Sequence, residues 1–410
     1  MNARRHGRVA IVRVAQRRAA LDRSPRMTEV HGGTAPRFRG VRDAFARLFA
    51  EHGEVGAAVA VRHRGELVVD LWAGLADRDG GRPWQRDTAA LVFSSTKGVT
   101  AVLLHVLAER GEIDLDAPVA AYWPDFAAEG KGALTVRDAL AHRAGVPVVD
   151  RALTLEQVLA WDPVVEAIAA QRPVWPPGTR HGYHVRTYGW IAGELVRRVT
   201  GRRFGDAVAR ELAAPLALEL WVGLPEAEEP RVATLLPPPP IADPKARALF
   251  DKLAGPGTLT GRALTGPSDL FHYDTMWNRR ALRAAEMPSS SGIATARALA
   301  TLYGALVSEV DGVRLLRPET VAAACHPRSE GPDAVLILPS RFGTGFMLPP
   351  TLSTAAPGGA FGHAGAGGSL GFADPAAQIG FGYVMNAMGS ALTGDPRATS
   401  LVEAVYACLR

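Results

Sequence analysis

Hydrophobic and polar residues in this 410-residue chain form strand-like runs near both ends and helical patterns between them. The apolar runs 55–61 and 66–72 flank turn residues at 63–65, which predicts a β-hairpin. Amphipathic spacing predicts a helix over 37–49, before the hairpin, and another over 401–409, at the end of the chain. In the last quarter, three more runs predict strands: 342–348, 369–373 and 379–385, the last of which alternates glycine with large apolar residues.

The middle of the chain has helical and loop patterns without strand periodicity for over 200 residues. Apolar residues at three- and four-residue spacing within 99–107 predict one buried face of a helix that starts near Ser94 and ends before Gly111. Further helices are expected over 134–145 and 188–199, and each of them ends in a glycine turn.

Strands at both ends with helices between them predict an α/β protein, with one sheet built from both termini, flanking helices and an inserted helical lobe. We assign residues 27–98 and 336–410 to the sheet domain and residues 99–335 to the lobe. Many prolines within 223–288 predict a long, irregular insertion in this lobe.

Composition, with 47% apolar and 21% charged residues, is that of a soluble globular protein. The net charge is +5, but residues 1–26 contribute +7, which leaves −2 for the rest and no basic face for nucleic acid. We expect residues 1–26 to be a disordered basic extension, or translation to have begun upstream of Met27. Their apolar stretch 9–12 is too short for a signal peptide.

No apolar run approaches the roughly 18 residues of a membrane span, so we expect no membrane partner. Cys325 and Cys408 are far apart and have neither metal-ligand nor redox spacing, which fits a reducing compartment. We therefore expect a cytoplasmic protein. The oligomeric state does not follow from the sequence.

Ser94 stands three residues before Lys97 at the start of the predicted helix. Side chains at this spacing lie on the same side of a helix, so the hydroxyl and the amine point the same way. A serine becomes a nucleophile when a base takes its proton and nearby positive charge stabilises the alkoxide. The chain has 46 basic residues but only four lysines, and arginine could not replace Lys97 as a proton relay because guanidinium stays charged.

Two further stretches are candidate partners of Ser94. Tyr183 lies in a turn-rich segment before the helix at 188–199, and it could act as a base only if close positive charge such as Lys97 lowers its pKa. A core tyrosine is the alternative. The segment 361–369 is too glycine-rich for a plain strand interior and suits a backbone that approaches a ligand.

In this order and spacing, the three motifs resemble those of the serine β-lactamase and penicillin-binding-protein-like hydrolases. The similarity is strongest to class C β-lactamases and to the β-lactamase-like carboxylesterases of family VIII. Ser94 to Lys97 corresponds to S-x-x-K, Tyr183 to the tyrosine motif, and His363-Ala364-Gly365 stands in the place of K-T-G. The resemblance extends from about residue 28 to the C-terminus and includes two supporting stretches: 140–145 and 291–296.

This resemblance implies a β-lactamase-like fold with the site between the sheet and the lobe, and hydrolysis of a small carboxylic ester through an acyl-enzyme. Ser94 would attack, Lys97 and Tyr183 would share its proton, and Tyr183 would return a proton to the leaving alcohol. The backbone N–H groups of Ser94 and Ala366 would form the oxyanion hole, with His363 lining the cleft opposite Tyr183. The expected cleft and oxyanion-hole residues are therefore His363, Gly365 and Ala366.

Departures from the family pattern bear on the substrate. Class C β-lactamases have asparagine where this chain has Val185, and they have lysine where it has His363. Both changes resemble esterases and some peptidases of the superfamily more than antibiotic hydrolases. A β-lactamase, a D-amino-acid peptidase or an acyl transferase could use the same residues, as could a non-catalytic binding homologue, although such a homologue would be expected to lose Ser94, Lys97 or Tyr183.

Two other patterns are rejected as functional sites. Residues 367–371 match the G-x-S-x-G nucleophile elbow around Ser369, but no histidine follows His363 to serve as its base. His181 and His184 have no third ligand at a fitting spacing, so we expect solvated or supporting histidines and no metal site. No cofactor is expected.

Overall fold

A computed structural model describes residues 28–390 and 394–410, and the predicted basic extension 1–26 lies outside this range. The main sheet has 7 strands in the order β1-β3-β2-β12-β11-β10, with β4 paired to β3. All of these pairs are antiparallel, and β2 from the first part of the chain pairs with β12 from the last. The predicted sheet from both termini is thus confirmed. Its strands are β1 (Val30–Thr34), β2 (Gly56–His63), β3 (Glu66–Asp77), β4 (Arg82–Pro83), β10 (Phe361–Ala364), β11 (Leu370–Asp374) and β12 (Ile379–Met385).

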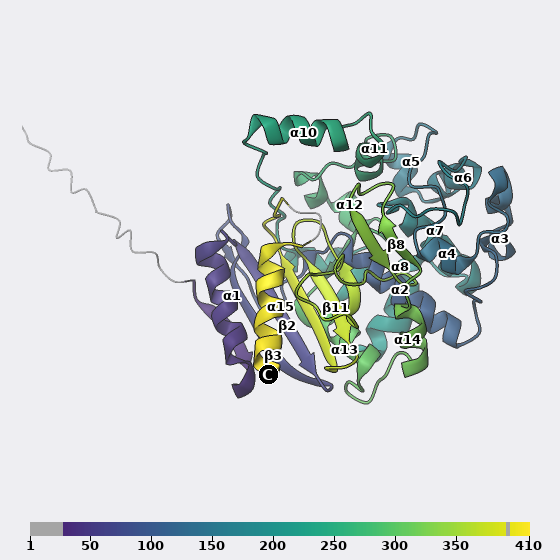
Figure 1. Ribbon diagram of the computed structural model, residues 1–410. Helices are drawn as coiled ribbons and strands as arrows, with labels where there is room; N and C mark the ends of the chain where they lie inside the picture. Colours follow the sequence, from purple (N-terminus) through teal and green to yellow (C-terminus); the bar gives the residue numbers. More distant parts are fainter. Residues whose placement is uncertain (1–27, 391–393) are drawn as a thin grey trace, which may run out of the picture.

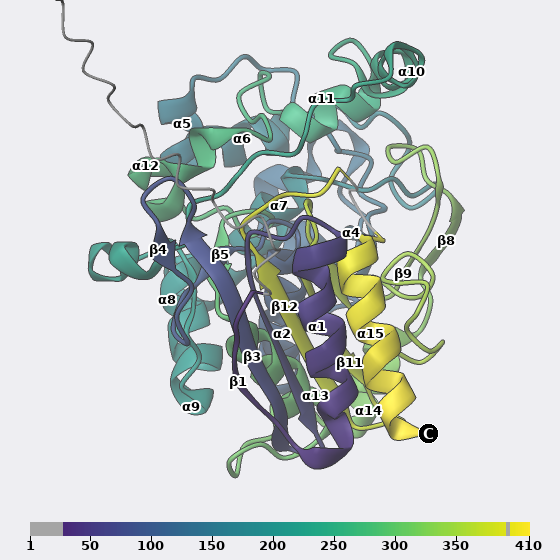
Figure 2. The same ribbon diagram turned by 90° about the vertical axis from the view of Figure 1, so that its left-hand side faces the viewer.

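Helices cover both faces of this sheet. On one face α1 (Arg39–Glu51) and α15 (Pro396–Leu409) lie side by side (Figures 1 and 2). On the other face α13 (Ala296–Val307) packs directly on β12, β2 and β11. Helix α13 falls within the range 99–335 that we assigned to the lobe, so the sheet side of the molecule includes more than the predicted segments. The division into domains itself stays a prediction.

Helix α2 (Ser95–Glu109) lies between strand β10 and helices α7 and α8 of the lobe. Every residue from Ser95 to Leu107 is buried, not only one face as predicted, because neighbours surround the helix. No helix in the described part of the chain is both long and apolar enough to cross a membrane. The other helices of the lobe are α3 (Val119–Tyr122), α4 (Val136–Leu140), α5 (Leu155–Leu159), α6 (Asp162–Ala170), α7 (Thr187–Thr200), α8 (Phe204–Val208), α9 (Ala214–Leu216) and α14 (Pro318–Cys325).

The insertion 223–288 is less irregular than predicted. It contains α10 (Pro244–Ala254), α11 (Leu259–Thr265) and α12 (Arg280–Ala284). The first two begin at side-chain caps, since Asp243 accepts a hydrogen bond from the backbone of Lys245, and Thr258 accepts one from Gly261. The many prolines stand between these helices or in their first turn, so they do not prevent helix formation.

Short strands within 99–335 correct the expectation of a helical lobe without strands, and two of them pair with strands from the predicted sheet segments 27–98 and 336–410. β5 (Ala90–Leu91), β7 (Gly292–Ala294) and β6 (Leu220–Val222) form a three-stranded sheet in the order β5-β7-β6. β8 (Ser329–Pro332) and β9 (Pro339–Phe342) form a separate pair. The strand predicted over 342–348 is wrong, because the chain turns after Phe342, whereas β10 was missed in the glycine-rich stretch.

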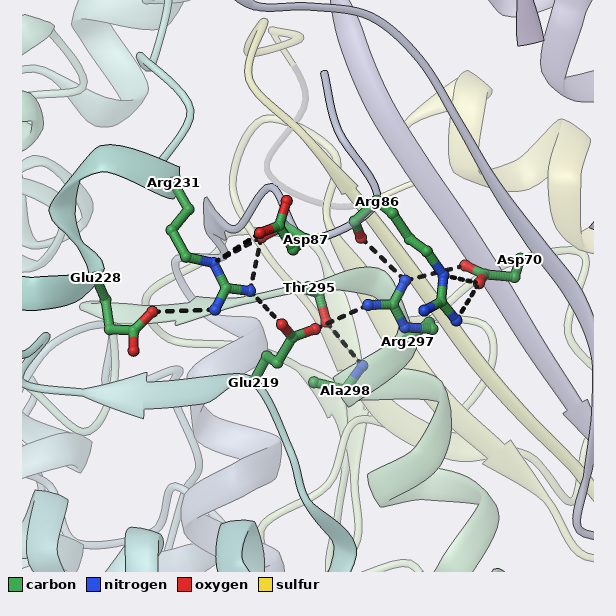
Figure 3. Close-up of polar contacts among 9 residues, drawn as sticks. All are labelled: Asp70, Arg86, Asp87, Glu219, Glu228, Arg231, Thr295, Arg297 and Ala298. Carbon is green, nitrogen blue, oxygen red and sulfur yellow. Dashed lines mark hydrogen bonds and ion pairs between the residues drawn. The ribbon is translucent and has the colours of Figure 1, made fainter. Parts of the chain in front are cut away.

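Charged side chains join the sheet to the lobe beside α13 (Figure 3). Arg297 of α13 contacts Asp70 of β3 at 3.4 Å and Glu219, which precedes β6, at 2.9 Å. Glu219 also pairs with Arg231 of the lobe, and Asp70 pairs with Arg86 at 3.1 Å. Three regions that are distant in the sequence, 70–86, 219–231 and the start of α13, are therefore connected by alternating charges.

Candidate active site

Ser94 lies at the junction of β5 and α2, where it is the N-cap residue of the helix. The preceding Phe93 has a φ of 41°, a left-handed conformation that is rare for a large side chain. Phe93 is held there by edge contacts with the rings of Tyr273 at 5.4 Å and Trp277 at 5.2 Å. A strained residue beside a candidate nucleophile fits a turn whose shape serves function rather than stability.

Lys97 lies one helical turn after Ser94, with its amine fully inside the protein. Its Nζ donates to the backbone oxygens of Val185 at 2.7 Å and Ser289 at 3.1 Å, and lies 3.3 Å from Ser94 Oγ. A neutral amine has two hydrogens, which these two carbonyls can accept. The lone pair is then free to face the Ser94 hydroxyl, which is the arrangement of a general base.

Electrostatics at Lys97 favour that neutral form. Burial lowers the pKa of the Lys97 amine well below its usual value, and the nearby cation of Arg186 lowers it further. Because no carboxylate bonds to Lys97 among the described residues, nothing there compensates for the loss of water around an ammonium ion. The predicted proton relay through Lys97 is therefore physically reasonable.

Tyr183 faces the same point from the segment before α7. Lys97 Nζ lies 4.8 Å from the centre of its ring, and the phenol interacts with the Ser94 side chain, although not with the full geometry of a hydrogen bond. Burial raises the pKa of the Tyr183 phenol far above its usual value, and the Ser94 side chain lowers it only in part. The expected lowering by Lys97 is absent, since Lys97 is itself pushed toward the neutral form. Tyr183 is thus better suited to donate a proton than to accept one.

Asp333 is a buried residue of the site that the sequence analysis missed. Its carboxylate accepts hydrogen bonds from the backbone N–H of Tyr183 at 3.0 and 3.1 Å and from Ser340 Oγ at 2.7 Å. It also accepts from the backbone of Val335 and Leu336, both at 2.8 Å, so it fixes two loops at once. Asp333 lies 150 positions from Tyr183, and only the Gly-Pro-Asp turn signal marks it in the sequence.

The two histidines near Tyr183 have structural hydrogen bonds. His181 Nε2 lies 3.0 Å from Ser340 Oγ, while His184 Nδ1 bonds to the Gly182 oxygen at 2.6 Å and its Nε2 accepts from the backbone of Val146 at 3.0 Å. Both side chains are buried, so of the two roles expected for them, solvated or supporting, the supporting role fits the structure. They support the segment that carries Tyr183.

The glycine-rich segment 361–369 contains the turn between β10 and β11, and this turn lies next to Ser94. Ser369 is buried here, donates to the Val92 oxygen at 2.8 Å, and lies 3.1 Å from Ser95 Oγ. A Cβ atom on Gly365 would lie 2.2 Å from both the Ser369 hydroxyl and the Val92 oxygen, so only glycine fits. Ser369 therefore anchors this turn, and among the described residues its hydroxyl bonds to no side chain that could act as a base.

Ser94, Tyr183 and Ala366 line one cavity of about 20 Å³, together with Val185, Leu264, Tyr273, Leu336, Met347 and Ala364. The backbone N–H groups of Ser94 and Ala366 donate no hydrogen bond within 28–390 and 394–410, whereas that of Gly365 donates to Ser369. The N–H groups of Ser94 and Ala366 therefore have no partner in this part of the chain, whereas that of Gly365 is already used, and the oxyanion hole itself stays a prediction.

His363 supports the site from behind instead of lining the cavity as expected. Its side chain is fully buried, and its ring centre lies 6.0 Å from that of Tyr183. Nδ1 donates to the Ala364 oxygen at 2.7 Å, and burial, aided by Lys97, lowers the pKa of the imidazole to about 3. The ring is therefore neutral at physiological pH, which leaves Nε2 without a proton.

Comparison with known proteins finds the same fold and related sequences. The family model described as Beta-lactamase matches residues 41–406. The esterase/β-lactamase LipL of Mycobacterium tuberculosis is 40% identical over 380 residues, which cover 88% of this chain and 84% of that protein. A crystal structure of a family VIII carboxylesterase matches with a TM-score of 0.81 and 39% identity, over 93% of this chain and all of the other. A penicillin-binding protein homologue from Caulobacter crescentus matches with a TM-score of 0.82 and 39% identity, over 93% of this chain and 100% of its own.

Proposed function

Since the chain belongs to the Beta-lactamase family of serine hydrolases, we propose that it hydrolyses small carboxylic esters through an acyl-enzyme on Ser94. The observation that carries this proposal is the geometry at Lys97. Two backbone carbonyls fix the amine 3.3 Å from Ser94 Oγ, and burial favours its neutral form. The arrangement places a base beside the nucleophile.

In the first half of the reaction, Lys97 takes the proton of Ser94 as the serine oxygen bonds to the ester carbonyl carbon. The backbone N–H groups of Ser94 and Ala366 stabilise the carbonyl oxygen as it becomes negative. Tyr183 then protonates the leaving alcohol and recovers a proton from the Lys97 ammonium. In the second half, water loses a proton to the same pair, attacks the acyl carbon and releases the carboxylic acid, which restores Ser94.

An ester is a better substrate for this site than a β-lactam. Val185 has an apolar side chain where an amide would contact the side chain of the antibiotic, and its backbone oxygen is already bonded to Lys97. His363 is neutral and buried, so it offers no cation to the β-lactam carboxylate. The names of the relatives include esterases as well as β-lactamases, and slow β-lactam turnover or acyl transfer to an alcohol remains the second candidate.

We further propose that the protein works in the cytoplasm, because both of its cysteines, Cys325 and Cys408, are free thiols.

The direct test measures hydrolysis of p-nitrophenyl acetate and butyrate, a chromogenic cephalosporin and a D-alanyl peptide. We expect the esters to be cleaved best and Ser94→Ala to abolish turnover. Ser369→Ala is the matched control and should retain most of the activity, because Ser369 anchors a turn and has no base. A phosphonate inhibitor found on Ser369 by mass spectrometry, or a cephalosporin turned over as fast as the best ester, would contradict the proposal.

The role of Tyr183 can be tested separately. Tyr183→Phe removes one oxygen and keeps the ring, so the fold should persist while acylation slows by about 10² to 10⁴-fold, the range for general acid–base catalysis. Single-turnover acylation rates with circular dichroism would measure both effects. A variant within about threefold of the parent would show that Lys97 alone manages the proton.

A further inference from the structure

A larger cavity, of about 380 Å³, lies beside the one at Ser94. Leu264, Tyr273 and Ala366 line both, so the two are adjacent. Its remaining walls come from α10, α11, the segment before α10 and the loop around Met388. Helices α10 and α11 lie together at the upper end of the molecule in Figures 1 and 2. The volume is within the range of about 300–1,000 Å³ for small-molecule sites.

The lining of this cavity suits an uncharged, apolar group. Its apolar side chains include Pro238, Pro239, Ile241, Phe250, Leu264 and Met388. The one arginine among the described lining, Arg247, is paired with Asp251 at 3.0 Å, and the carboxylate of Asp269 lies 3.9 Å from His272. A substrate carboxylate would therefore meet no unpaired cation here, whereas a hydrocarbon chain would be removed from water.

Helix α10 leaves apolar side chains uncovered at this cavity. It has no buried residue, and Phe250 is 45% exposed and Leu249 57% exposed. Ile241, in the segment before the helix, is 38% exposed. Phe250 and Ile241 line the cavity and Leu249 does not. A chain bound in the cavity would cover the first two and leave the third in solvent.

We propose that this cavity is the acyl-chain subsite of the enzyme and that its substrates are esters of medium-length, uncharged carboxylic acids. The proposal rests on the ester hydrolysis proposed above. The position of Tyr183 determines which end of the ester enters the large cavity, because Tyr183 lines the small cavity but not the large one. The leaving alcohol must lie beside Tyr183 to receive its proton. The acyl chain then extends the other way, past Ala366 and Tyr273, toward Phe250.

The test is a chain-length series on the full-length enzyme. With p-nitrophenol as the constant leaving group, kcat/KM should rise about fourfold for each methylene that is added beyond acetate, until the cavity is filled. With acetate as the constant acyl group, lengthening the alkyl alcohol should change kcat/KM by less than about threefold in total. A flat acyl series, or a rise only in the alcohol series, would overturn the subsite.

Phe250→Asp places a charge in the cavity, and we expect it to lower the ratio of octanoate to acetate kcat/KM at least tenfold. Leu249→Asp is the matched control on the same helix, with the same charge outside the cavity, and should leave this ratio unchanged. Equal losses in both variants would assign the chain preference to the exposed surface of α10 and overturn the proposal. Phe250→Ala, with a smaller loss in the same direction, covers the case in which Phe250→Asp fails to fold.

Acetate turnover separates this proposal from the proposed function. If the enzyme cleaves p-nitrophenyl acetate in a Ser94-dependent manner but shows no acyl-length preference, only the subsite is wrong. If Ser94→Ala retains acetate turnover, the catalytic assignment itself fails.

Discussion

Arg186 is a buried cation whose partners among the described residues include no carboxylate. It is 2% exposed and donates to Ser290 Oγ and the Leu264 oxygen, both at 3.0 Å. Its guanidinium lies 5.0 Å from the Phe271 ring and 5.2 Å from the Trp277 ring, so aromatic faces replace the missing counter-ion. An unpaired buried cation is costly to keep, and its effect on the pKa of Lys97 gives it a use at the active site.

Removing this cation should change the pH dependence of acylation. Lys97 acts when neutral, so kcat/KM should rise with pH through the pKa of Lys97 and then level off. In Arg186→Met that pKa is less depressed, so the acidic limb should move to higher pH. His142 and His363 also face Lys97. Burial lowers the pKa values of both, so they stay neutral in the pH range where Lys97 is expected to titrate.

Arg186→Lys is the control for this shift, since it keeps a charge at the position. The acidic limb of the Arg186→Lys pH profile should lie close to that of the parent enzyme, even if the maximum rate is lower. The measurement is the kcat/KM profile of p-nitrophenyl acetate from pH 5 to 9, with thermal melting to check the fold. An acidic limb in Arg186→Met that coincides with the parent's would exclude tuning by Arg186.

For single residues, the sequence predicts properties that depend on nearby positions in the chain, and it misses those that depend on packing. The spacing of Ser94 and Lys97 fixes their common orientation because a helix repeats regularly. The pKa of Tyr183 depends on its burial against His142, at 4.9 Å between ring centres, and Phe342, at 5.8 Å. These neighbours are distant in the sequence, so the direction of the shift could not be read from it.

Among the elements, β12 and α13 approach closely because glycines face the helix. A Cβ atom on Gly382 would lie 2.2 Å from the Ala296 oxygen, and one on Gly380 would lie 2.3 Å from the Gly304 nitrogen. The alternation of glycine with large residues in 379–385 therefore has two uses. The large side chains fill the face toward α1 and α15, and the glycines admit α13.

Gly382→Ala should destabilise the protein by about 1–3 kcal/mol or more, because backbone on both sides must move to admit one methyl group. Thermal melting of the purified variant would measure this as a lower Tm. Gly359→Ala is the matched control, since nothing lies within 4 Å of a Cβ atom there. A melting temperature of Gly382→Ala equal to that of Gly359→Ala would show that α13 can shift without cost.

Strand prediction was accurate where the pattern repeats and failed where it does not. Strand β12 has the predicted bounds Ile379–Met385, because its alternation is sustained over the whole strand. The apolar run 342–348 is buried yet forms turns, with Phe346 and Met347 at 0 and 1% exposure. Buried turns and buried strands have the same composition, so an apolar run cannot distinguish them.

For the whole molecule, the sequence predicted the sheet from both termini but not the charges that connect it to the lobe. Arg297 and Arg231 share the carboxylate of Glu219, as Figure 3 shows. Glu219 precedes β6, which pairs with β7. Strand β7 follows Ser289, whose backbone oxygen accepts a hydrogen bond from Lys97. The network therefore fixes the small sheet that positions the active-site helix, although each of its charges looks like an ordinary surface residue in the sequence.

Glu219→Gln keeps the shape of the side chain and removes the charge shared by the two arginines. Because the Glu219 side chain is 28% exposed and those of Arg231 and Arg297 are 24% and 17% exposed, water compensates only in part. We expect a loss of about 1.5–3 kcal/mol in stability, the range for hydrogen bonds to charged groups, seen as a lower Tm that high salt does not restore. Glu228→Gln is the control, because Glu228 is equally exposed but contacts Arg231 alone, at 3.0 Å. If both variants melt at the same temperature, the shared carboxylate has no special role, and packing of α13 on β12 is sufficient to hold the sheet against the lobe.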